Sequence, residues 1–251
     1  MNHFSKNQEK LVRGLYKKKK RLEHKLCICE GLRSCRELYN FRPEIIKFAV
    51  AVNNIDVEYF KGIDFYLLDK SAFEKISATV STQGIIFIVE IPEKIIEDML
   101  NVPFIFVLDK IADPGNFGTI LRTCAAVGLR DIWYSKGSVD PYSEKTIRSA
   151  LSAQFTLNLH EYDSLSSLLA SADKNGYNSI YRTEPINGKN CFEEGKLFKK
   201  SVIIFGNEAN GVEEIKNSIP LNIPMPGGFE SLNVAQAVTV ILFEAVRRKI
   251  L

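Results

Sequence analysis

The 251-residue sequence predicts an α/β fold in which a parallel sheet is preceded by a smaller α/β domain. Continuous apolar runs such as FIFVLD (104–109) and SVIIFG (201–206) are typical of buried parallel strands. Segments with helical spacing of apolar residues lie between such runs, and this alternation is typical of α/β proteins. With 45% hydrophobic and 25% charged residues, the composition is that of a globular protein.

The first domain is expected over residues 1–98. Residues 5–21 have helical character, and HKLCICEGLRSCRELY (24–39) indicates a short strand, a turn and a helix. Runs rich in branched and aromatic residues predict three further strands, at 45–51, 64–69 and 84–90.

The second domain is expected over residues 99–251. Strands are predicted at 104–109, 131–135, 177–181 and 201–206, and helices at 119–128, 142–153, 164–176 and 233–249. The last helix carries an apolar stripe that is core by default, made of Val234, Ala237, Val238, Ile241, Leu242, Ala245 and Val246.

Two features bear on location and on metal chemistry. No apolar run approaches the length that spans a bilayer, and residues 1–21 lack the apolar core of a signal peptide, so we expect a cytoplasmic protein with no membrane partner. The cysteines lack the C-x-x-C spacing of a zinc site, so we expect them to be reduced and mostly buried, and we expect no metal. They are Cys27, Cys29, Cys35, Cys124 and Cys191.

Positive charge is concentrated near the start of the chain. The formal net charge is +3, but residues 6–21 combine many cations with a single acid, Glu9. The cations are Lys6, Lys10, Arg13, Lys17, Lys18, Lys19, Lys20 and Arg21. Such a block favours a nucleic-acid partner and a merely solvated helix face about equally.

Three loops at the predicted carboxyl ends of strands are unusual, and ligands of parallel sheets bind at that edge. The first loop is LDKIADPGNFGTILRTCAAVG (108–128), where a turn at 113–115 precedes a helix. Asn116 enters this helix and Arg122 follows in its second turn. Taken alone, the loop is explained if Asn116 caps the helix and Arg122 pairs with a carboxylate.

The second loop is IIFGNEANGVEE (203–214). Gly206 lets another backbone or a flat ligand approach closely because it has no side chain. Glu208 could be a carboxylate at a helix start. The loop has neither the G-x-G-x-x-G fingerprint nor a P-loop, which argues against a nucleotide-dependent oxidoreductase and against nucleotide hydrolysis. His3, His24 and His160 lie outside all three loops, which argues against Ser-His-Asp and Cys-His hydrolases.

The third loop is IPMPGGFESLNVAQAV (223–238). Its two prolines fix two φ angles and its two glycines permit a bend. Ser231 or Asn233 is a natural N-cap for the helix that follows. Capping alone does not explain why both residues follow a rigid loop.

Together the loops resemble the three sequence motifs of the SpoU/TrmH family of RNA ribose 2′-O-methyltransferases in the SPOUT superfamily. The motifs appear in order as DPGNFGTILRTCAAVG, IIFGNEANGV and IPMPGGFESLNVAQAVTVILFEA, within residues 104–248. KKKKRLEHKLCICEGLRSCREL also resembles the N-terminal substrate-binding domain of many members. The resemblance implies a C-terminal trefoil knot, S-adenosylmethionine as methyl donor, and a homodimer whose subunits both contribute to each site.

The resemblance also implies roles for individual residues. The donor would rest on backbone near Gly206, Ile223 and Leu232, with Met225 close by. Arg122 would act on the ribose 2′-hydroxyl, either as its base or, preferably, as a cation that clamps a phosphate and stabilises the developing alkoxide, because a guanidinium normally stays protonated. Asn116 and Glu208 would position Arg122 and the loops, and Ser231 and Asn233 would orient the nucleotide.

One departure from the family pattern lies between the first two motifs. IRSALSAQF has Ser152 where members commonly have glycine, which leaves the local backbone conformation open. Arg148 in this stretch is either a phosphate contact, which we prefer, or a surface charge.

The leading hypothesis is methylation of RNA, ribosomal rather than transfer RNA, with the basic first domain gripping the RNA backbone. The alternatives are the same activity on transfer RNA and an RNA-binding protein without catalysis.

Overall fold

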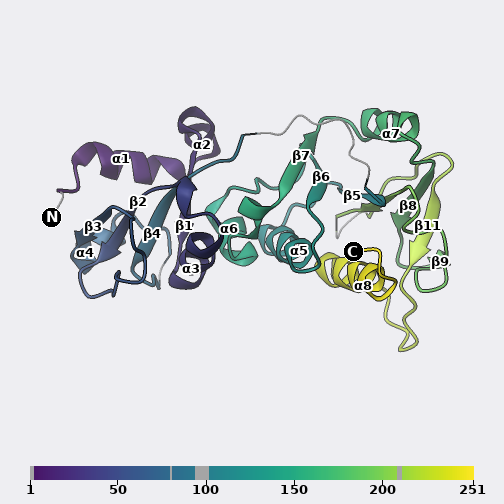
Figure 1. Ribbon diagram of the computed structural model, residues 1–251. Helices are drawn as coiled ribbons and strands as arrows, with labels where there is room; N and C mark the ends of the chain where they lie inside the picture. Colours follow the sequence, from purple (N-terminus) through teal and green to yellow (C-terminus); the bar gives the residue numbers. More distant parts are fainter. Residues whose placement is uncertain (1–2, 80, 94–101, 208–210) are drawn as a thin grey trace. The chain divides into compact units, whose positions relative to one another are not determined.

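The structure is a computed structural model that describes residues 3–79, 81–93, 102–207 and 211–251 (Figure 1). The chain forms two compact units. Unit 1 comprises Met1–Glu93 and Asp140–Thr156, and unit 2 comprises Lys94–Val139 and Leu157–Leu251. The domain boundary expected between residues 98 and 99 lies outside the described residues and stays a prediction.

Unit 1 contains a four-stranded sheet in the order β1-β4-β2-β3. β4 is antiparallel to β1 and β2, and β2 pairs with β3 in parallel. The strands confirm those predicted from the sequence and are β1 (Leu26–Glu30), β2 (Ile46–Val52), β3 (Phe65–Leu68) and β4 (Ile85–Glu90). The helices of the first 93 residues are α1 (Lys6–Leu15), α2 (Lys18–His24), α3 (Leu32–Phe41) and α4 (Lys70–Glu74), with a 3-10 turn at Pro43–Ile45.

The helical character predicted for residues 5–21 is confirmed, and the chain forms two helices there because it breaks between α1 and α2. Ser5 starts α1 with a capping box to Gln8, and Lys17 is extended, with φ −95° and ψ 127°. Arg21 does not belong to the exposed basic face. It is only 4% exposed, its Nη2 lies 2.6 Å from Asp140 Oδ2, and its Nη1 donates to the carbonyl of Leu15 at 2.8 Å.

The segment 140–156 packs into the core of unit 1. It forms α6 (Glu144–Ala150) and a 3-10 turn (Ala153–Thr156), and its Ile147 and Phe155 are buried in one cluster with Cys29 and Phe87. The helix predicted at 142–153 is therefore shorter than expected. Part of the sequence between the first two motifs belongs to the core of unit 1.

At the position where family members commonly have glycine, Ser152 has a backbone conformation that glycine favours. Its φ is +65°, so it adopts the left-handed conformation that favours glycine. The Ser152 hydroxyl donates to the carbonyl of Ser34 at 3.0 Å, which offsets part of the cost. Arg148 is tied down in the same unit, since Nη1 lies 2.6 Å from Glu144 Oε1 and donates to Thr79 Oγ1 at 2.8 Å. The phosphate contact preferred for Arg148 stays a prediction.

Unit 2 contains a seven-stranded sheet in the order β7-β6-β5-β10-β8-β11-β9, and its ladders are parallel. The parallel sheet predicted from the sequence is confirmed. The strands are β5 (Phe104–Leu108), β6 (Asp131–Ser135), β7 (Asn158–Tyr162), β8 (Ser179–Thr183), β9 (Lys189–Asn190), β10 (Ser201–Phe205) and β11 (Ile219–Asn222).

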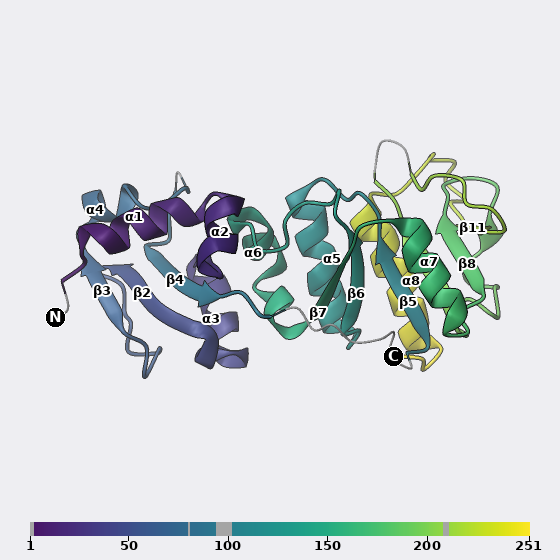
Figure 2. The same cartoon turned by 90° about the horizontal axis from the view of Figure 1, so that it is seen from above.

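Helices cover both faces of this sheet. α5 (Pro114–Ala126) and α8 (Val234–Arg247) pack together on one face, and α7 (Leu165–Lys174) lies on the other (Figures 1 and 2). All five residues of β5 and of β10 are buried, as expected for central parallel strands.

The predicted apolar stripe of the last helix is largely confirmed. Val234, Val238, Ile241, Leu242 and Ala245 are buried. Val246 is instead 37% exposed, because it lies on the outer face of α8.

The five cysteines are buried and free, as expected. No helix in the described part of the chain is long and apolar enough to cross a bilayer. Among the same residues, no three His, Cys, Asp or Glu side chains are grouped so that they could hold a metal ion.

Candidate functional site

A cavity of about 500 Å³ lies at the carboxyl ends of β8, β10 and β11 in unit 2. Residues from the second and third motif loops, the start of α8 and the end of β8 line it. The four residues expected to hold the donor, Gly206, Ile223, Met225 and Leu232, are all among them, as are Ser231 and Asn233. The fold thus brings together residues that are far apart in the sequence.

Gly206 lies where the chain folds back on the end of β10. The amide of Gly211 donates to the carbonyl of Asn207 at 3.0 Å, and these two residues form an isolated bridge. A Cβ atom on Gly206 would lie 2.2 Å from the carbonyl carbon and oxygen of Gly211 and 2.5 Å from the nitrogen of Val212. The sequence predicted that either another backbone segment or a flat ligand approaches Gly206. The structure shows a backbone segment there, and this segment shapes one wall of the cavity.

Asn233 joins the start of α8 to the start of α5. It is the N-cap of α8, because its Oδ1 accepts a hydrogen bond from the amide of Ala235 at 2.9 Å. Its Nδ2 donates to Oδ1 of Asn116 at 3.0 Å. The first and third motifs therefore meet through their asparagines, which fixes one helix start against the other.

The capping role considered for Asn116 is wrong. Asp113 is the N-cap of α5, and its Oδ1 accepts from the amide of Asn116 at 2.7 Å. Pro114 occupies the first helical position, where its missing N–H costs nothing, so the helix begins earlier than the sequence suggested. The Asn116 side chain is thereby left to contact Asn233.

Arg122 does not line the cavity of its own chain. It is exposed on α5 and has no hydrogen-bond or ion-pair partner among residues 3–79, 81–93, 102–207 and 211–251. The carboxylate pairing considered for Arg122 is therefore not observed within this part of the chain. Glu208 lies outside the described residues.

The loop between β10 and β11 is held to the loop after β5 by an ion pair. Lys110 Nζ lies 2.6 Å from Glu213 Oε1. Their hydrogen bond raises the pKa of Lys110 and lowers the pKa of Glu213. Both side chains are at least half exposed, so the pair contributes little to stability.

Sequence reasoning missed the polar residues that β8 contributes to the cavity. The predicted strand ended at 181, whereas β8 runs to Thr183 and delivers Arg182 and Glu184 to the cavity wall. Arg182 Nη1 lies 2.5 Å from Glu184 Oε2, and Arg182 Nε donates to Ser218 Oγ at 3.2 Å. The available signal was the polar run RTE directly after an apolar strand.

Both units match known protein families. The SpoU rRNA Methylase family matches residues 103–243, and the MRM3-like substrate binding domain matches residues 6–86. A relative from Bacillus subtilis, the 23S rRNA (guanosine(2553)-2′-O)-methyltransferase RlmP, is 30% identical over 250 residues. The alignment covers 95% of this chain and 96% of the relative.

Solved structures share the fold. A TrmH-family protein from Porphyromonas gingivalis superposes with a TM-score of 0.80 at 26% identity, covering 98% of this chain and 100% of that one. The SpoU methyltransferase AviRb from Streptomyces viridochromogenes, solved in complex with AdoMet, gives a TM-score of 0.81 at 20% identity, with 98% and 99% covered. At this lower identity the likeness shows the fold alone.

Proposed function

The chain belongs to the SpoU rRNA methylase family, and from this premise we propose that it transfers a methyl group from S-adenosylmethionine to a ribose 2′-hydroxyl of ribosomal RNA. The observation that carries the proposal is the cavity at the carboxyl ends of β8, β10 and β11, around which the second and third motifs converge. The Bacillus subtilis relative, which aligns with nearly the whole chain and is named as a 23S rRNA 2′-O-methyltransferase, supports the choice of substrate.

The cavity fits the proposed donor in size and chemistry. A volume of about 500 Å³ lies within the usual range of small-molecule sites. Ile223 and Leu232 offer apolar walls for a nucleoside, and the backbone beside Gly206 offers hydrogen-bonding groups with no intervening side chain. When bound, S-adenosylmethionine supplies an electrophilic methyl group on a sulfonium.

The protein's own residues act on the acceptor. An alcohol is a poor nucleophile until its proton leaves, so a nearby cation that stabilises the developing alkoxide lowers the barrier. We assign this role to the guanidinium of Arg122, and the same group also clamps an adjacent phosphate. Ser231 and Asn233 orient the nucleotide at the cavity, and the hydrogen bond from Asn233 to Asn116 holds that edge rigid. Glu208 keeps its proposed positioning role.

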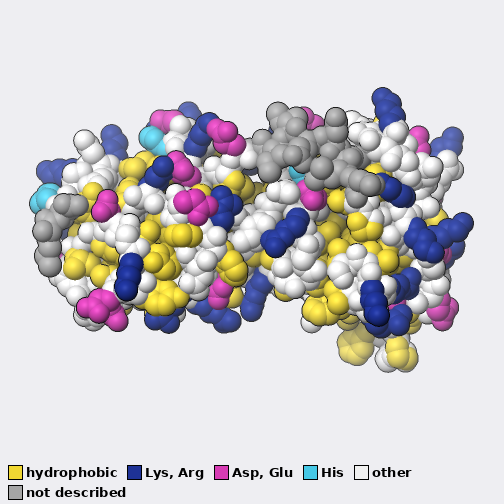
Figure 3. Space-filling model, in the orientation of Figure 1, with side chains coloured by type: hydrophobic (Ala, Val, Ile, Leu, Met, Phe, Trp, Pro, Cys, Tyr) yellow, Lys and Arg dark blue, Asp and Glu magenta, His cyan; other side chains and the backbone are white. Residues whose placement is uncertain are grey.

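A homodimer would bring Arg122 to a donor cavity. The outer face of α8 exposes Phe243 (53%) and Val246, and the loop before α8 exposes Phe229 (84%). Figure 3 shows hydrophobic side chains exposed on α8 and on that loop. α5, which carries Arg122, packs beside α8. Pairing of two such faces would cover the apolar patch and let Arg122 of one subunit serve the cavity of the other.

Mixed dimers test this arrangement. Arg122→Ala alone should abolish methyl transfer with donor binding retained, and Gly206→Ala alone should abolish donor binding. When the two variants are mixed and allowed to exchange subunits, activity should return, because one site of each mixed dimer combines an intact cavity with an intact Arg122. Mixtures as inactive as the separate variants would refute the shared site.

The topology supports a C-terminal trefoil knot. β10 lies between β5 and β8, and β11 lies beyond β8, yet the chain then returns through 223–233 to pack α8 on α5. This return closes the third motif loop around the cavity.

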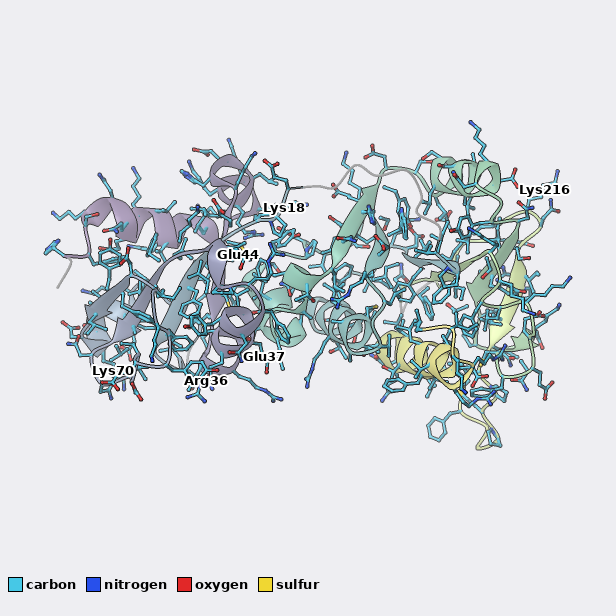
Figure 4. All side chains as sticks on the ribbon, viewed as in Figure 1. Lys18, Arg36, Glu37, Glu44, Lys70 and Lys216 are labelled. Carbon is cyan, nitrogen blue, oxygen red and sulfur yellow. The ribbon has the colours of Figure 1, made fainter. Side chains whose placement is uncertain are left out.

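Unit 1 would bind the RNA backbone. It matches a substrate binding domain and carries the exposed lysines at 17–19. Lys18, labelled in Figure 4, starts α2, and Figure 3 shows further cations around α1 and α2. Ribosomal RNA as substrate fits the cytoplasmic location expected from the sequence.

The test is transfer of labelled methyl groups from S-adenosylmethionine to purified ribosomal RNA and, separately, to transfer RNA. Transfer to ribosomal RNA that lacks the modification supports the proposal. Methyl transfer to transfer RNA alone would show that transfer RNA is the substrate. Tight RNA binding without methyl transfer to either RNA would show an RNA-binding protein without catalysis.

A further inference from the structure

Glu184 occupies the centre of the cavity's wall. β8 lies between β10 and β11 in the sheet, so the residue after β8 lies between Gly206, which follows β10, and Ile223, which follows β11. The backbone of Glu184 is fixed, because its amide donates to the carbonyl of Leu221 at 2.9 Å. A nucleoside that rests on Gly206 and Ile223 must therefore pass over Glu184.

One carboxylate oxygen of Glu184 accepts a hydrogen bond from the protein, and the other accepts none from the part of the chain that the structure describes. Its Oε2 accepts from Arg182 Nη1 at 2.5 Å, and Arg182 is itself held by Ser218. Its Oε1 has no hydrogen-bond partner among the described residues. With the side chain 34% exposed at a cavity wall, Oε1 is an acceptor available to a ligand.

We propose that Glu184 accepts hydrogen bonds from the ribose hydroxyls of the methyl donor, an inference that rests on the proposed function. Arg182 already balances the charge of the carboxylate, so its remaining capacity is to accept hydrogen bonds more than to attract a cation. Vicinal ribose hydroxyls offer neighbouring donors, and a carboxylate binds them in the dinucleotide sites of other α/β proteins. Glu184 is thus a specificity residue that favours a ribonucleoside donor.

Two parts of the donor could contact a carboxylate, the ribose and the methionine portion. The ammonium of the methionine portion is the other group that a carboxylate could hold, and Glu184 is the sole carboxylate among the described residues that line the cavity. Pairing with Arg182 makes the ammonium the weaker candidate. A ligand that keeps the ribose and lacks the amino acid separates the two.

The experiment is calorimetry of the full chain with three ligands: S-adenosylhomocysteine, 5′-methylthioadenosine, and the 2′,3′-dideoxy form of 5′-methylthioadenosine. The wild type should bind 5′-methylthioadenosine roughly tenfold or more tightly than its dideoxy form, as expected for hydrogen bonds to a charged group. In Glu184→Ala this difference should vanish, because the partner of the hydroxyls is gone. Glu184→Gln, which keeps the side chain's shape, should reduce it.

Glu213→Ala is the matched control, since Glu213 is a carboxylate at the same edge of the sheet that does not line this cavity. It should keep the full difference. The inference is overturned if Glu184→Ala discriminates the dideoxy ligand as the wild type does, or if it weakens S-adenosylhomocysteine but not 5′-methylthioadenosine. Failure of the wild type to bind S-adenosylhomocysteine would instead overturn the proposed function itself.

Discussion

Gly206→Ala perturbs the cavity through a single added methyl group. That Cβ would lie 2.2 Å from the carbonyl carbon and oxygen of Gly211, whereas carbon atoms pack at about 3.5–4.0 Å. The atoms in the way are backbone, so the loop after β10 must move by more than about 1 Å. Gly206 does not need a positive φ, so the effect is steric.

Overpacking of this kind costs about 1–3 kcal/mol. At about 2–4 °C per kcal/mol for a chain of this size, the melting temperature should fall by roughly 2–12 °C. The displaced loop lines the cavity, so binding of S-adenosylhomocysteine should be lost as well. Differential scanning fluorimetry and calorimetry measure the two effects.

Gly195→Ala is the control for this prediction, because a Cβ there meets no atom within 4 Å and the residue has no positive φ. It should melt and bind like the wild type. If Gly206→Ala behaved like Gly195→Ala in both measurements, the close approach of the loop would not shape the cavity and the reasoning would be refuted.

Two further predictions concern unit 1 and the end of α8. Replacing the lysines at 17–19 with alanine should weaken RNA binding and reduce the magnitude of the negative slope of log affinity against log salt by about 2. Lys70→Ala on α4 (Figure 4) should change neither the affinity nor the slope in a filter-binding titration. If the triple variant and the wild type had equal slopes, the lysines would be a solvated face without RNA contacts. Hydrogen bonds from Arg247 and Arg248 lower the pKa of Glu244 to about 2, against an ordinary 4.5. A carboxylate with a lowered pKa stabilises the folded state above pH 4.5, and this stabilisation is lost as the pH falls from 4.5 towards 2. The unfolding free energy of Glu244→Gln should therefore fall below that of the wild type most strongly near neutral pH, and the difference should shrink between pH 4.5 and 2. A difference independent of pH would contradict the ion-pair account.

The central strands could be predicted from the sequence because their signal is local. β5 and β10 are continuous apolar runs, and all of their residues are buried. β7 and β11 were missed because β7 (NLHEY) alternates polar residues at an edge of the sheet and β11 contains Pro220. Such strands are specified by pairing with neighbours, which the sequence does not display.

The candidate site likewise contains residues that the sequence predicted and one that it did not. Gly206, Ile223, Met225 and Leu232 were predicted through motif resemblance, and they line one cavity. Glu184 follows a strand that no motif covers, so only the register of β8 with its neighbours brings it there.

The packing of 140–156 was also beyond sequence reasoning. The apolar residues of this segment carry no mark of which core they join. Ile147 and Phe155 join the core of unit 1, although the chain enters and leaves the segment from unit 2.

The most direct test of the account is the chemical position of a transferred methyl group. Ribosomal RNA methylated by the pure protein with labelled S-adenosylmethionine would be digested to nucleosides and analysed by mass spectrometry. The account predicts label on the ribose, as a 2′-O-methylnucleoside, and none from Arg122→Ala. Label on a base, or undiminished label from Arg122→Ala, would contradict it.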